Sequence, residues 1–248
     1  FTQDLLPADI TGHYYYNQKT GDFELRKGPV FAQALMADEI NRAPPKTQSA
    51  LIEAMQEKQV TIEGNTFKLP DPFFVIATRN PIETEGVYPL PEAQLDRFLI
   101  KSNMGYLEKK KELDMLKLKN MQDEVEIGKV GDSLGEKLYG LYKNVYASEI
   151  ILEYIRDIIL ETRNVQDLVL GASPRAGEHL LYAAKSRAII DGRDYTIPDD
   201  VKRVTNKVLN HRVLLSVDAE LEGMDVEEII SDIIDKKVEA PKGEFKSD

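Results

Sequence analysis

The sequence lacks several features that would assign it to a particular class of protein. It contains no cysteine, which excludes disulfide bonds and cysteine-ligated metals and suits a reducing cytosol. A membrane helix needs an apolar run of about 18 residues, and the sequence contains none of that length. Its start also lacks a charged segment followed by an apolar one, as a signal peptide would have. We therefore expect a cytoplasmic protein with no membrane span and no signal peptide.

Positive charge is also scarce in the chain. Its 248 residues include 32 lysines and arginines against 43 aspartates and glutamates, a formal net charge of −11. Because nonspecific nucleic-acid binding usually depends on a basic surface, we expect no nucleic-acid partner unless a local basic patch exists. Hydrophobic residues make up 42 %, enough to form a sizeable core in one large or two modest domains.

The apolar pattern changes along the chain, from short runs separated by turns to longer stretches with helical periodicity. The first part predicts buried parallel strands at Val30–Ala37, Phe73–Thr78 and Phe98–Ile100. Pro44 and Pro45 predict the start of a helix that crosses over between the first two strands. This arrangement is typical of an α/β domain followed by an all-helical domain.

Two hairpins are expected in the α/β part. One spans Tyr14–Leu25, and the other spans Val60–Leu69 with its turn around Glu63-Gly64-Asn65. The first hairpin contains three consecutive tyrosines at 14 to 16. These rings either grip a partner or substrate, or pack against the body of the protein or a neighbouring subunit.

Capping residues and apolar stripes predict the helices of the second part. A charged helix is expected over Glu108–Gln122, followed by a looser connection over Asp123–Gly135. Further helices are expected from Ser148, from Ser173-Pro174 and from Pro198. The last helix carries a stripe of isoleucines at positions 229, 230, 233 and 234.

Two acids directly follow the first expected strand. Since the carboxyl ends of parallel strands form the ligand-binding edge of such a sheet, Asp38 and Glu39 are expected there. Mg²⁺ prefers hard oxygen ligands and keeps several waters, so one carboxylate, that of Asp38, suits it. Glu39 can then orient and deprotonate an attacking water. Taken alone, the pair could equally be a strand end that meets a polar loop.

Three further polar residues are candidates from their local context. Asn80 follows the second expected strand, where its amide either holds the attacking water or a γ-phosphate, or forms an Asn-Pro turn. Arg97 precedes the third expected strand and either reaches a phosphate in a neighbouring subunit or pairs with Asp96 or Glu92. Arg175 lies in the first turn of a helix, where the dipole disfavours a cation, so it either meets phosphate or is an exposed surface residue.

The order of these signals is more specific than any one of them. Asp-Glu, Ala-Thr-x-Asn-Pro, Leu-Asp-Arg-Phe and Gly-Ala-Ser-Pro-Arg-Ala follow one another as in an AAA+ domain and its helical lid. More narrowly, the chain resembles the MoxR family of AAA+ ATPases over nearly its whole length. The strings that carry the resemblance are Ala37–Leu51, Pro72–Thr78, Tyr88–Phe98, Gly171–Ala176 and Asp191–Tyr195.

The resemblance implies a role for each candidate residue. Asp38 and Glu39 look like the Walker B pair, which serves Mg²⁺ binding and ATP hydrolysis. Asn80 looks like sensor 1, and Arg97 looks like the arginine finger. Arg175 looks like sensor 2, acting on its own subunit's nucleotide or on a neighbour's.

The resemblance also implies the fold class and the domains. The fold is α/β: an AAA+ P-loop-type parallel-sheet core, incomplete at its N-terminus, followed by an all-helical lid domain. The expected segments are the core at 1–107, a charged helix and connection at 108–147, the lid at 148–238 and a flexible tail at 239–248. The two hairpins look like the family's helix-2 insert and pre-sensor-1 hairpin, which are expected to face the ring pore or the client.

One element of the family is missing from the sequence. The phosphate-binding loop, Gly-x-x-x-x-Gly-Lys-Ser/Thr, occurs nowhere in the 248 residues, and Phe1–Pro7 resembles the family's second core strand. We therefore expect a fragment, a truncated gene product or a chain whose start is not included. We also expect a sheet edge and apolar surface to be left uncovered.

The implied function is ATP binding and hydrolysis, with ATP and Mg²⁺ as cofactors. In such a protein hydrolysis is coupled to remodelling, maturation or cofactor insertion of partner proteins, often with a von Willebrand A domain partner. The expected assembly is a homo-hexameric ring. The alternative is a truncated interaction module that does not hydrolyse ATP but retains the Walker B, sensor and lid elements.

Overall fold

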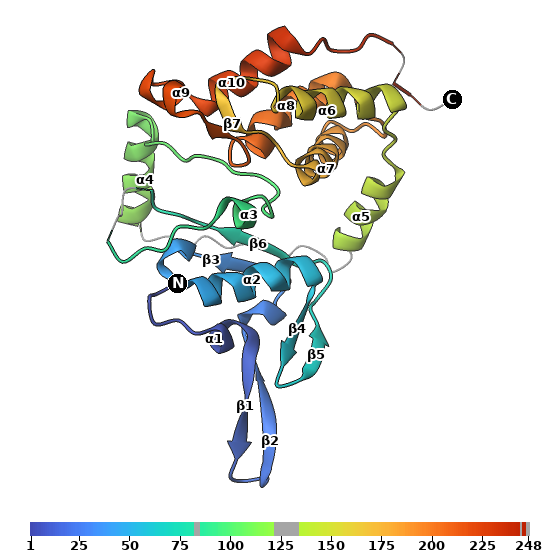
Figure 1. Ribbon diagram of the computed structural model, residues 1–248. Helices are drawn as coiled ribbons and strands as arrows, with labels where there is room; N and C mark the ends of the chain where they lie inside the picture. Colours follow the sequence, from blue (N-terminus) through green and yellow to red (C-terminus); the bar gives the residue numbers. More distant parts are fainter. Residues whose placement is uncertain (82–84, 122–133, 244, 247–248) are drawn as a thin grey trace. The chain divides into compact units, whose positions relative to one another are not determined.

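In a computed structural model the chain forms two compact units, residues 1–98 and 99–248, which are described separately (Figure 1). The structure describes residues 1–81, 85–121, 134–243 and 245–246. Most of the connection predicted between 123 and 135 lies outside these residues, and the predicted domain boundaries stay predictions. Among the described residues, every helix is too short or too polar to cross a membrane.

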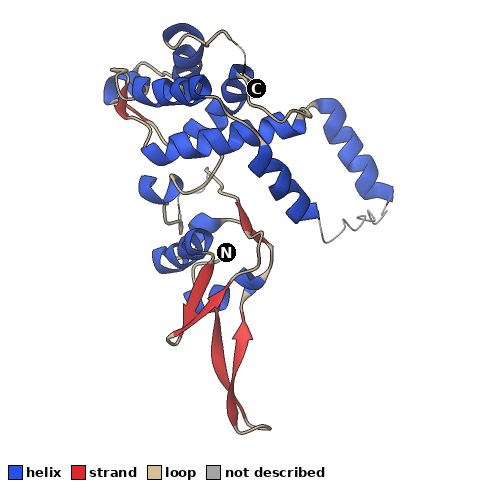
Figure 2. Ribbon diagram, turned by 90° about the vertical axis from the view of Figure 1, so that its right-hand side faces the viewer, coloured by secondary structure: helices blue, strands red, loops and turns tan. Residues whose placement is uncertain are grey.

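The first unit combines one parallel strand pair, two hairpins and short helices. Its elements are α1 (Pro7–Thr11), β1 (Gly12–Asn17), β2 (Asp22–Lys27), η1 (Pro29–Phe31), β3 (Ala34–Ala37), η2 (Ile40–Arg42), α2 (Pro45–Glu57), β4 (Gln59–Ile62), β5 (Asn65–Lys68), β6 (Phe74–Ala77) and α3 (Glu92–Leu95). Figure 2 shows that the strands gather in this unit, apart from one short pair in the second.

The strands β3 and β6 form the parallel pair that the sequence predicts. Ala34 pairs with Phe74 and Ala37 pairs with Ala77, so the two strands end at the same level. The predicted strand from Val30 begins four residues too early, because Pro29–Phe31 forms a 3₁₀ turn in which Val30 is fully buried. The prediction of a strand buried on both sides is also wrong for this pair. Three of its large apolar side chains, Met36, Phe74 and Ile76, are more than half exposed.

Helix α2 carries the crossover between β3 and β6, as predicted from the two prolines. Pro45 occupies the first turn, where its missing N–H costs no hydrogen bond. The helix buries Leu51, Ile52 and Ala54 in the apolar core of the first unit. The buried face also includes two polar residues, Thr47 and Gln48, which the apolar pattern did not indicate.

Both predicted hairpins are confirmed. In β1–β2, Asn17 pairs with Asp22 across the turn, and in β4–β5, Ile62 pairs with Asn65 across Glu63 and Gly64. Both turn residues of the second hairpin have positive φ, 48° and 84°, as a two-residue turn that matches the strand twist requires.

The strand predicted at Phe98–Ile100 is wrong. Phe98 closes a turn after α3, because its N–H donates to the carbonyl oxygen of Leu95 at 3.0 Å. The carbonyl of Leu99 accepts a hydrogen bond from the Arg212 guanidinium at 3.2 Å, so a side chain satisfies it instead of a strand neighbour. A short apolar run does not by itself distinguish a strand from such a segment.

The second unit is a helical bundle with one two-stranded pair. Its elements are α4 (Lys109–Met121), α5 (Leu134–Asn144), α6 (Glu149–Glu161), β7 (Leu168–Leu170), α7 (Pro174–Ile190), α8 (Pro198–Leu209), β8 (Leu214–Leu215), α9 (Val217–Leu221), α10 (Val226–Asp232) and η3 (Ile233–Lys237). The helices predicted from residues 108, 148, 173 and 198 are present. Helix α5 lies where a connection was predicted, and β7, β8 and α9 were not predicted.

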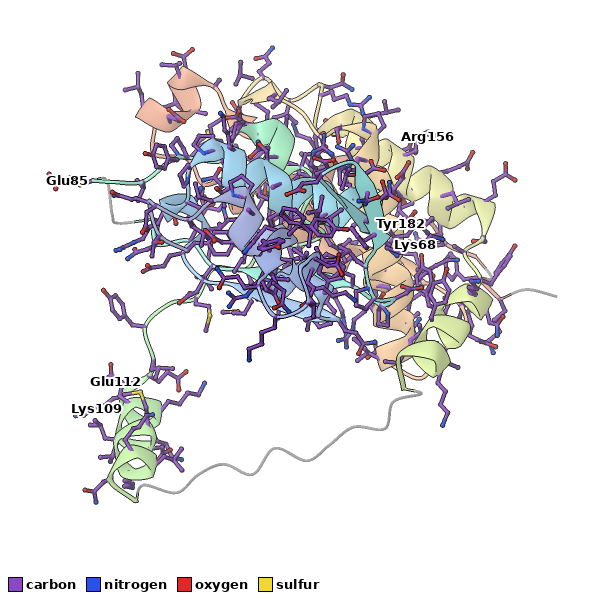
Figure 3. The ribbon with its side chains drawn as sticks, turned by 90° about the horizontal axis from the view of Figure 1, so that it is seen from below. Lys68, Glu85, Lys109, Glu112, Arg156 and Tyr182 are labelled. Atoms are coloured by element: carbon purple, nitrogen blue, oxygen red, sulfur yellow. The ribbon has the colours of Figure 1, made fainter. Side chains whose placement is uncertain are left out.

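The core of the second unit lies between α6, α7, α8 and the last helix. The apolar face of α6 is buried, with Ile151 and Ile158 fully covered. Helix α5 packs on α7 through Tyr142 and Tyr182, whose ring centroids lie 6.2 Å apart in an edge-to-face arrangement. Tyr182 is labelled in Figure 3, together with Lys109 and Glu112 in the first turn of α4.

Candidate active site

Because β3 and β6 end at the same level, the acids that follow β3 and the backbone of Asn80 that follows β6 lie at the same edge of the strand pair. Asp38 follows Ala37 at the end of β3, and Thr78 follows Ala77 at the end of β6. Two backbone hydrogen bonds extend the pairing beyond the strands: Thr78 N–H donates to the Ala37 carbonyl and Ile40 N–H donates to the Thr78 carbonyl, both at 3.0 Å. The side chains that follow therefore lie at the carboxyl edge of the parallel pair.

Thr78 connects the two acids through its side chain. Its hydroxyl donates to Asp38 Oδ1 at 2.5 Å and accepts the Glu39 N–H at 2.9 Å. Asp38 is exposed, and Glu39 is half-buried. One hydroxyl thus fixes the carboxylate of one acid and the backbone of the other.

Glu39 has a left-handed backbone, with φ 54° and ψ 49°. A residue with a Cβ pays about 1–2 kcal/mol for this conformation, so its neighbours must hold it there. The turn sends the chain from the strand into η2, which places Arg42 beside Glu39. Their side chains form an ion pair, with Arg42 Nε 3.0 Å from Glu39 Oε2.

Buried polar side chains support the loops around these acids. Gln48 is 1 % exposed, and the two hydrogens of its amide are shared among the carbonyl oxygens of Ile40 at 3.3 Å, Ala43 at 3.0 Å and Tyr88 at 3.0 Å. Asn41, 4 % exposed, donates from Nδ2 to the Asn80 carbonyl at 3.4 Å. Asn41 also accepts the Tyr88 N–H on its own carbonyl at 2.6 Å. The Asn41 bond ties the backbone of Asn80 to the segment that follows the acids.

The two predicted arginines come from other elements. Arg97 is half-buried in the turn after α3, and its N–H donates to the Gln94 carbonyl at 3.2 Å. Arg175 is half-buried in the first turn of α7 and belongs to the second unit. The structure therefore brings together Asp38, Glu39 and Asn80, and it places each arginine on its own element.

The backbone just before α7, at Gly171, packs closely against the backbone of Thr162 and Arg163. A Cβ on Gly171 would lie 2.8 Å from both Arg163 Cα and the Thr162 carbonyl oxygen, so only glycine fits there. The Thr162 hydroxyl accepts the Ala172 N–H at 3.0 Å, and Ser173 caps the helix by accepting the Ala176 N–H at 3.3 Å. Arg175 thereby projects from a helix start with a fixed backbone.

The donors at the strand ends fit a magnesium ion that a nucleotide helps to hold. Mg²⁺ is usually bound by one or two carboxylates together with substrate phosphates and water. Asp38 offers such a carboxylate, since the Thr78 bond on Oδ1 leaves further acceptor capacity on its two oxygens. Among the described residues, no group of three or more histidines, cysteines or acids forms a metal site.

Models of known protein families match parts of both units. The model of the ATPase family associated with various cellular activities (AAA) matches residues 1–100, and the model of the AAA lid domain matches residues 160–233. Chaperone MoxR1 of Mycobacterium tuberculosis is 43 % identical over 245 residues, which cover 94 % of this chain and 64 % of that protein. Protein MoxR of Methylorubrum extorquens is 29 % identical over 86 % of this chain and 69 % of its own length. This chain belongs to the MoxR family of AAA+ ATPases.

Two further relatives agree with this membership of the MoxR family. The uncharacterized protein YeaC of Bacillus subtilis is 47 % identical over 236 residues, which cover 94 % of this chain and 74 % of YeaC. The crystal structure of a candidate ATPase from Cytophaga hutchinsonii superposes with a TM-score of 0.89 at 43 % identity, over 98 % of this chain and 76 % of that chain. The predicted α/β AAA+ core with a lid domain is thereby confirmed.

Sequence reasoning did not single out the residues that support the MoxR-like site. Thr78, Asn41 and Gln48 all lie inside the strings that carry the family resemblance, but no pattern indicated their contacts. A polar residue on the apolar face of a predicted helix, as at Gln48, is one signal that could have been used. A buried side chain of this kind must find hydrogen-bond partners.

Proposed function

We propose that the site at the ends of β3 and β6 hydrolyses ATP, with Asp38 as the magnesium ligand and Glu39 as the general base. The bound Mg²⁺ would neutralise charge on the β- and γ-phosphates. Glu39 orients the attacking water and accepts its proton, and Asn80 holds the same water or the γ-phosphate. The observation that carries the proposal is the single hydroxyl of Thr78, which ties Asp38 and Glu39 together at the strand ends.

The Glu39–Arg42 ion pair indicates what must change before Glu39 acts. A carboxylate that accepts from a guanidinium at 3.0 Å is oriented toward Arg42. Both side chains are partly exposed, 38 % and 40 %, so a pair of this kind contributes little free energy and is easily rearranged. In the proposed reaction Glu39 turns from Arg42 to the water when nucleotide is bound.

We propose that the guanidinium groups of Arg97 and Arg175 contact the phosphates of ATP. A guanidinium is always charged and presents donors that match phosphate oxygens, so either residue can stabilise the charge that develops in the transition state. In this proposal Arg97 acts on the nucleotide of a neighbouring subunit within a homo-hexameric ring, as an arginine finger. Arg175 contacts phosphate from the start of α7, where a neighbouring phosphate offsets the unfavourable position of a cation near a helix N-terminus.

The cellular role that we propose is remodelling or maturation of client proteins, including von Willebrand A domain partners. The name of the relative Chaperone MoxR1 supports a client-directed role. The β1–β2 hairpin supplies a suitable contact surface, since Tyr15, Tyr16 and Phe23 are exposed by 42 %, 54 % and 70 %. Glu24 stiffens this hairpin by accepting from Tyr15 at 2.8 Å and Asn17 at 2.7 Å.

Glu39→Gln tests the assignment of the base. The change keeps the shape of the side chain but removes its proton-accepting charge, so ATP turnover by the full-length protein should fall by about 100-fold or more. Calorimetry should show that Mg-ATP still binds. Glu53→Gln, an exposed carboxylate on α2, is the matched control and should keep wild-type turnover. Unchanged turnover in Glu39→Gln would falsify the role of Glu39.

Mixing two inactive variants tests the proposed action of Arg97 in a ring. Arg97→Ala and Glu39→Gln should each lose turnover on their own. In a mixture, Arg97 of a Glu39→Gln subunit can complete the site of an Arg97→Ala neighbour, so turnover should recover partly. If Arg97 acts on its own subunit's nucleotide, the mixture stays as inactive as its components.

A further inference from the structure

Thr78 contacts both acids of the site, but it has been given no role of its own in the proposed reaction. It is the first residue after β6, and its backbone already pairs with β3 through the Ala37 carbonyl. Its hydroxyl makes two further bonds, as a donor to Asp38 Oδ1 at 2.5 Å and as an acceptor from the Glu39 N–H at 2.9 Å. A hydroxyl has one proton and two lone pairs, so it can make both bonds at once.

Stability alone is a poor explanation for these two bonds. The Thr78–Asp38 bond is exposed, and both groups would hydrogen-bond to water in its absence. The backbone bonds on either side of Thr78 already hold the two strand ends together. The bonds of the hydroxyl instead fix the orientation of two groups that a reaction would use.

We propose that Thr78 is a positioning residue for the magnesium and water half of the site, an inference that rests on the proposed ATPase function. By engaging Oδ1 of Asp38, Thr78 restrains the carboxylate and would leave its other oxygen available to the metal or to metal-bound water. Outer partners that orient a metal-binding carboxylate in this way typically change metal affinity or activity by about 10- to 100-fold when they are removed.

The second bond of Thr78 acts on the base. Glu39 has a left-handed backbone with φ 54°, a conformation that is unfavourable for a residue with a Cβ. The Thr78 hydroxyl accepts the N–H of this residue, and so helps to hold the turn from which the Glu39 side chain projects. One side chain thereby couples the position of the base to the position of the metal ligand. A valine at this position has the same shape but lacks the hydroxyl.

The test compares Thr78→Val with Thr78→Ser in the full-length protein. Thr78→Ser keeps the hydroxyl and should retain turnover within about threefold of the wild type. Thr78→Val should lower kcat by about 10- to 100-fold and raise the magnesium concentration needed for half-maximal turnover. A second readout is nucleotide affinity by calorimetry, with Mg²⁺ and with EDTA. Thr78→Val should weaken binding with Mg²⁺ by about tenfold and leave binding in EDTA unchanged.

The possible outcomes separate this inference from the proposed function. If Glu39→Gln abolishes turnover while Thr78→Val retains wild-type turnover and magnesium dependence, the role of Thr78 is wrong and the ATPase proposal stands. If Thr78→Ser and Thr78→Val lose the same activity and melt at the same lowered temperature, the residue is structural and the inference also fails. If Glu39→Gln keeps turnover, the proposed function itself fails.

Discussion

Both units of the chain have an apolar core, but they differ in what their buried polar side chains do. In the second unit, apolar residues on α6, α7 and α8 form a continuous core, and the buried acid Asp200 is fully paired with Arg193. In the first unit, polar residues such as Thr78, Gln48 and Asn41 connect the loops at the ends of a single parallel pair. The difference shows that the second unit depends on burial for its fold, whereas the site in the first unit depends on directed hydrogen bonds.

The largest expected effect comes from breaking the ion pair that the second unit buries. Asp200 is 1 % exposed, and both of its oxygens accept from Arg193, at 2.5 Å and 2.7 Å. It also accepts the Ile197 N–H at 2.9 Å at the start of α8. Asp200→Ala takes both short carboxylate contacts from the partly buried Arg193, which keeps the longer ion pair to Asp191 at 3.3 Å, so the free energy of unfolding should fall by about 3–5 kcal/mol. Urea denaturation followed by circular dichroism measures this change.

Asp199 provides the control for that substitution. It is the exposed acid next to Asp200 in the same first turn of α8. Asp199→Ala removes only its favourable interaction with the helix dipole, so the loss should stay below about 1 kcal/mol. Equal losses in the two variants would show that the buried pair has no special importance.

A smaller loss of stability is expected from Gln48→Leu in the first unit. The substitution removes a buried amide that serves three carbonyl groups around the site. Leaving such groups without partners costs about 1–3 kcal/mol. Because these carbonyls belong to the loops beside Asp38 and Glu39, ATP turnover should fall more than stability alone explains, even well below the melting temperature.

Gln56→Leu is the matched control, because Gln56 is exposed on the same helix α2. It should change neither turnover nor the free energy of unfolding by a measurable amount. Wild-type turnover in Gln48→Leu would contradict the view that directed hydrogen bonds, rather than burial, maintain the site.

The smallest effect at neutral pH is expected from Tyr154→Phe in the core of the second unit. Burial, with smaller contributions from Asp235 and Asp199, raises the pKa of Tyr154 to about 12. Its hydroxyl has no hydrogen-bond partner among the described residues, so removing it should leave stability at pH 7 unchanged or slightly higher.

The raised pKa of Tyr154 predicts that the protein loses stability as the pH rises above 10. The folded pKa lies above the unfolded value near 10, so the folded state binds more protons between pH 10 and 12. The stabilisation of the folded state that results from this raised pKa is complete below pH 10. It is lost as the pH rises toward 12, by about 1.4 kcal/mol per pH unit. Denaturation series at pH 8, 10 and 11 should show a shallower decline in Tyr154→Phe. Parallel declines would mean that Tyr154 titrates normally.

The same contrast explains how far the sequence could predict the fold. The starts of α6, α7 and α8 were predicted closely, because a capping serine or a proline marks the first residue of each helix. The strands of the first unit were predicted less well. The run at 98–100 resembles a strand in composition, but its backbone groups find partners in a turn and in the side chain of Arg212. Such long-range partners leave no periodic signal.

The candidate site shows the same limit. Asp38, Glu39 and Asn80 follow apolar runs directly, so their placement at adjacent strand ends could be predicted from the parallel pairing. Nothing in the local sequence indicated that the Thr78 hydroxyl joins the two acids, because Thr78 and Asp38 lie 40 residues apart. A single side-chain hydrogen bond depends on register, which becomes visible only when the strands are paired.

The register of β3 and β6 determines which changes in length this chain can accept. Ala37 pairs with Ala77, so each strand must contribute a fixed number of residues between its pairing and its polar end. An extra residue in the turn between β4 and β5 leaves this count untouched. An extra residue between Phe74 and Thr78 would shift Asn80 by about 3.3 Å along the strand and turn its neighbours to the opposite face. Relatives that keep the activity should therefore vary in length at the hairpins and match residue for residue from Ala34 to Asn41 and from Phe74 to Asn80.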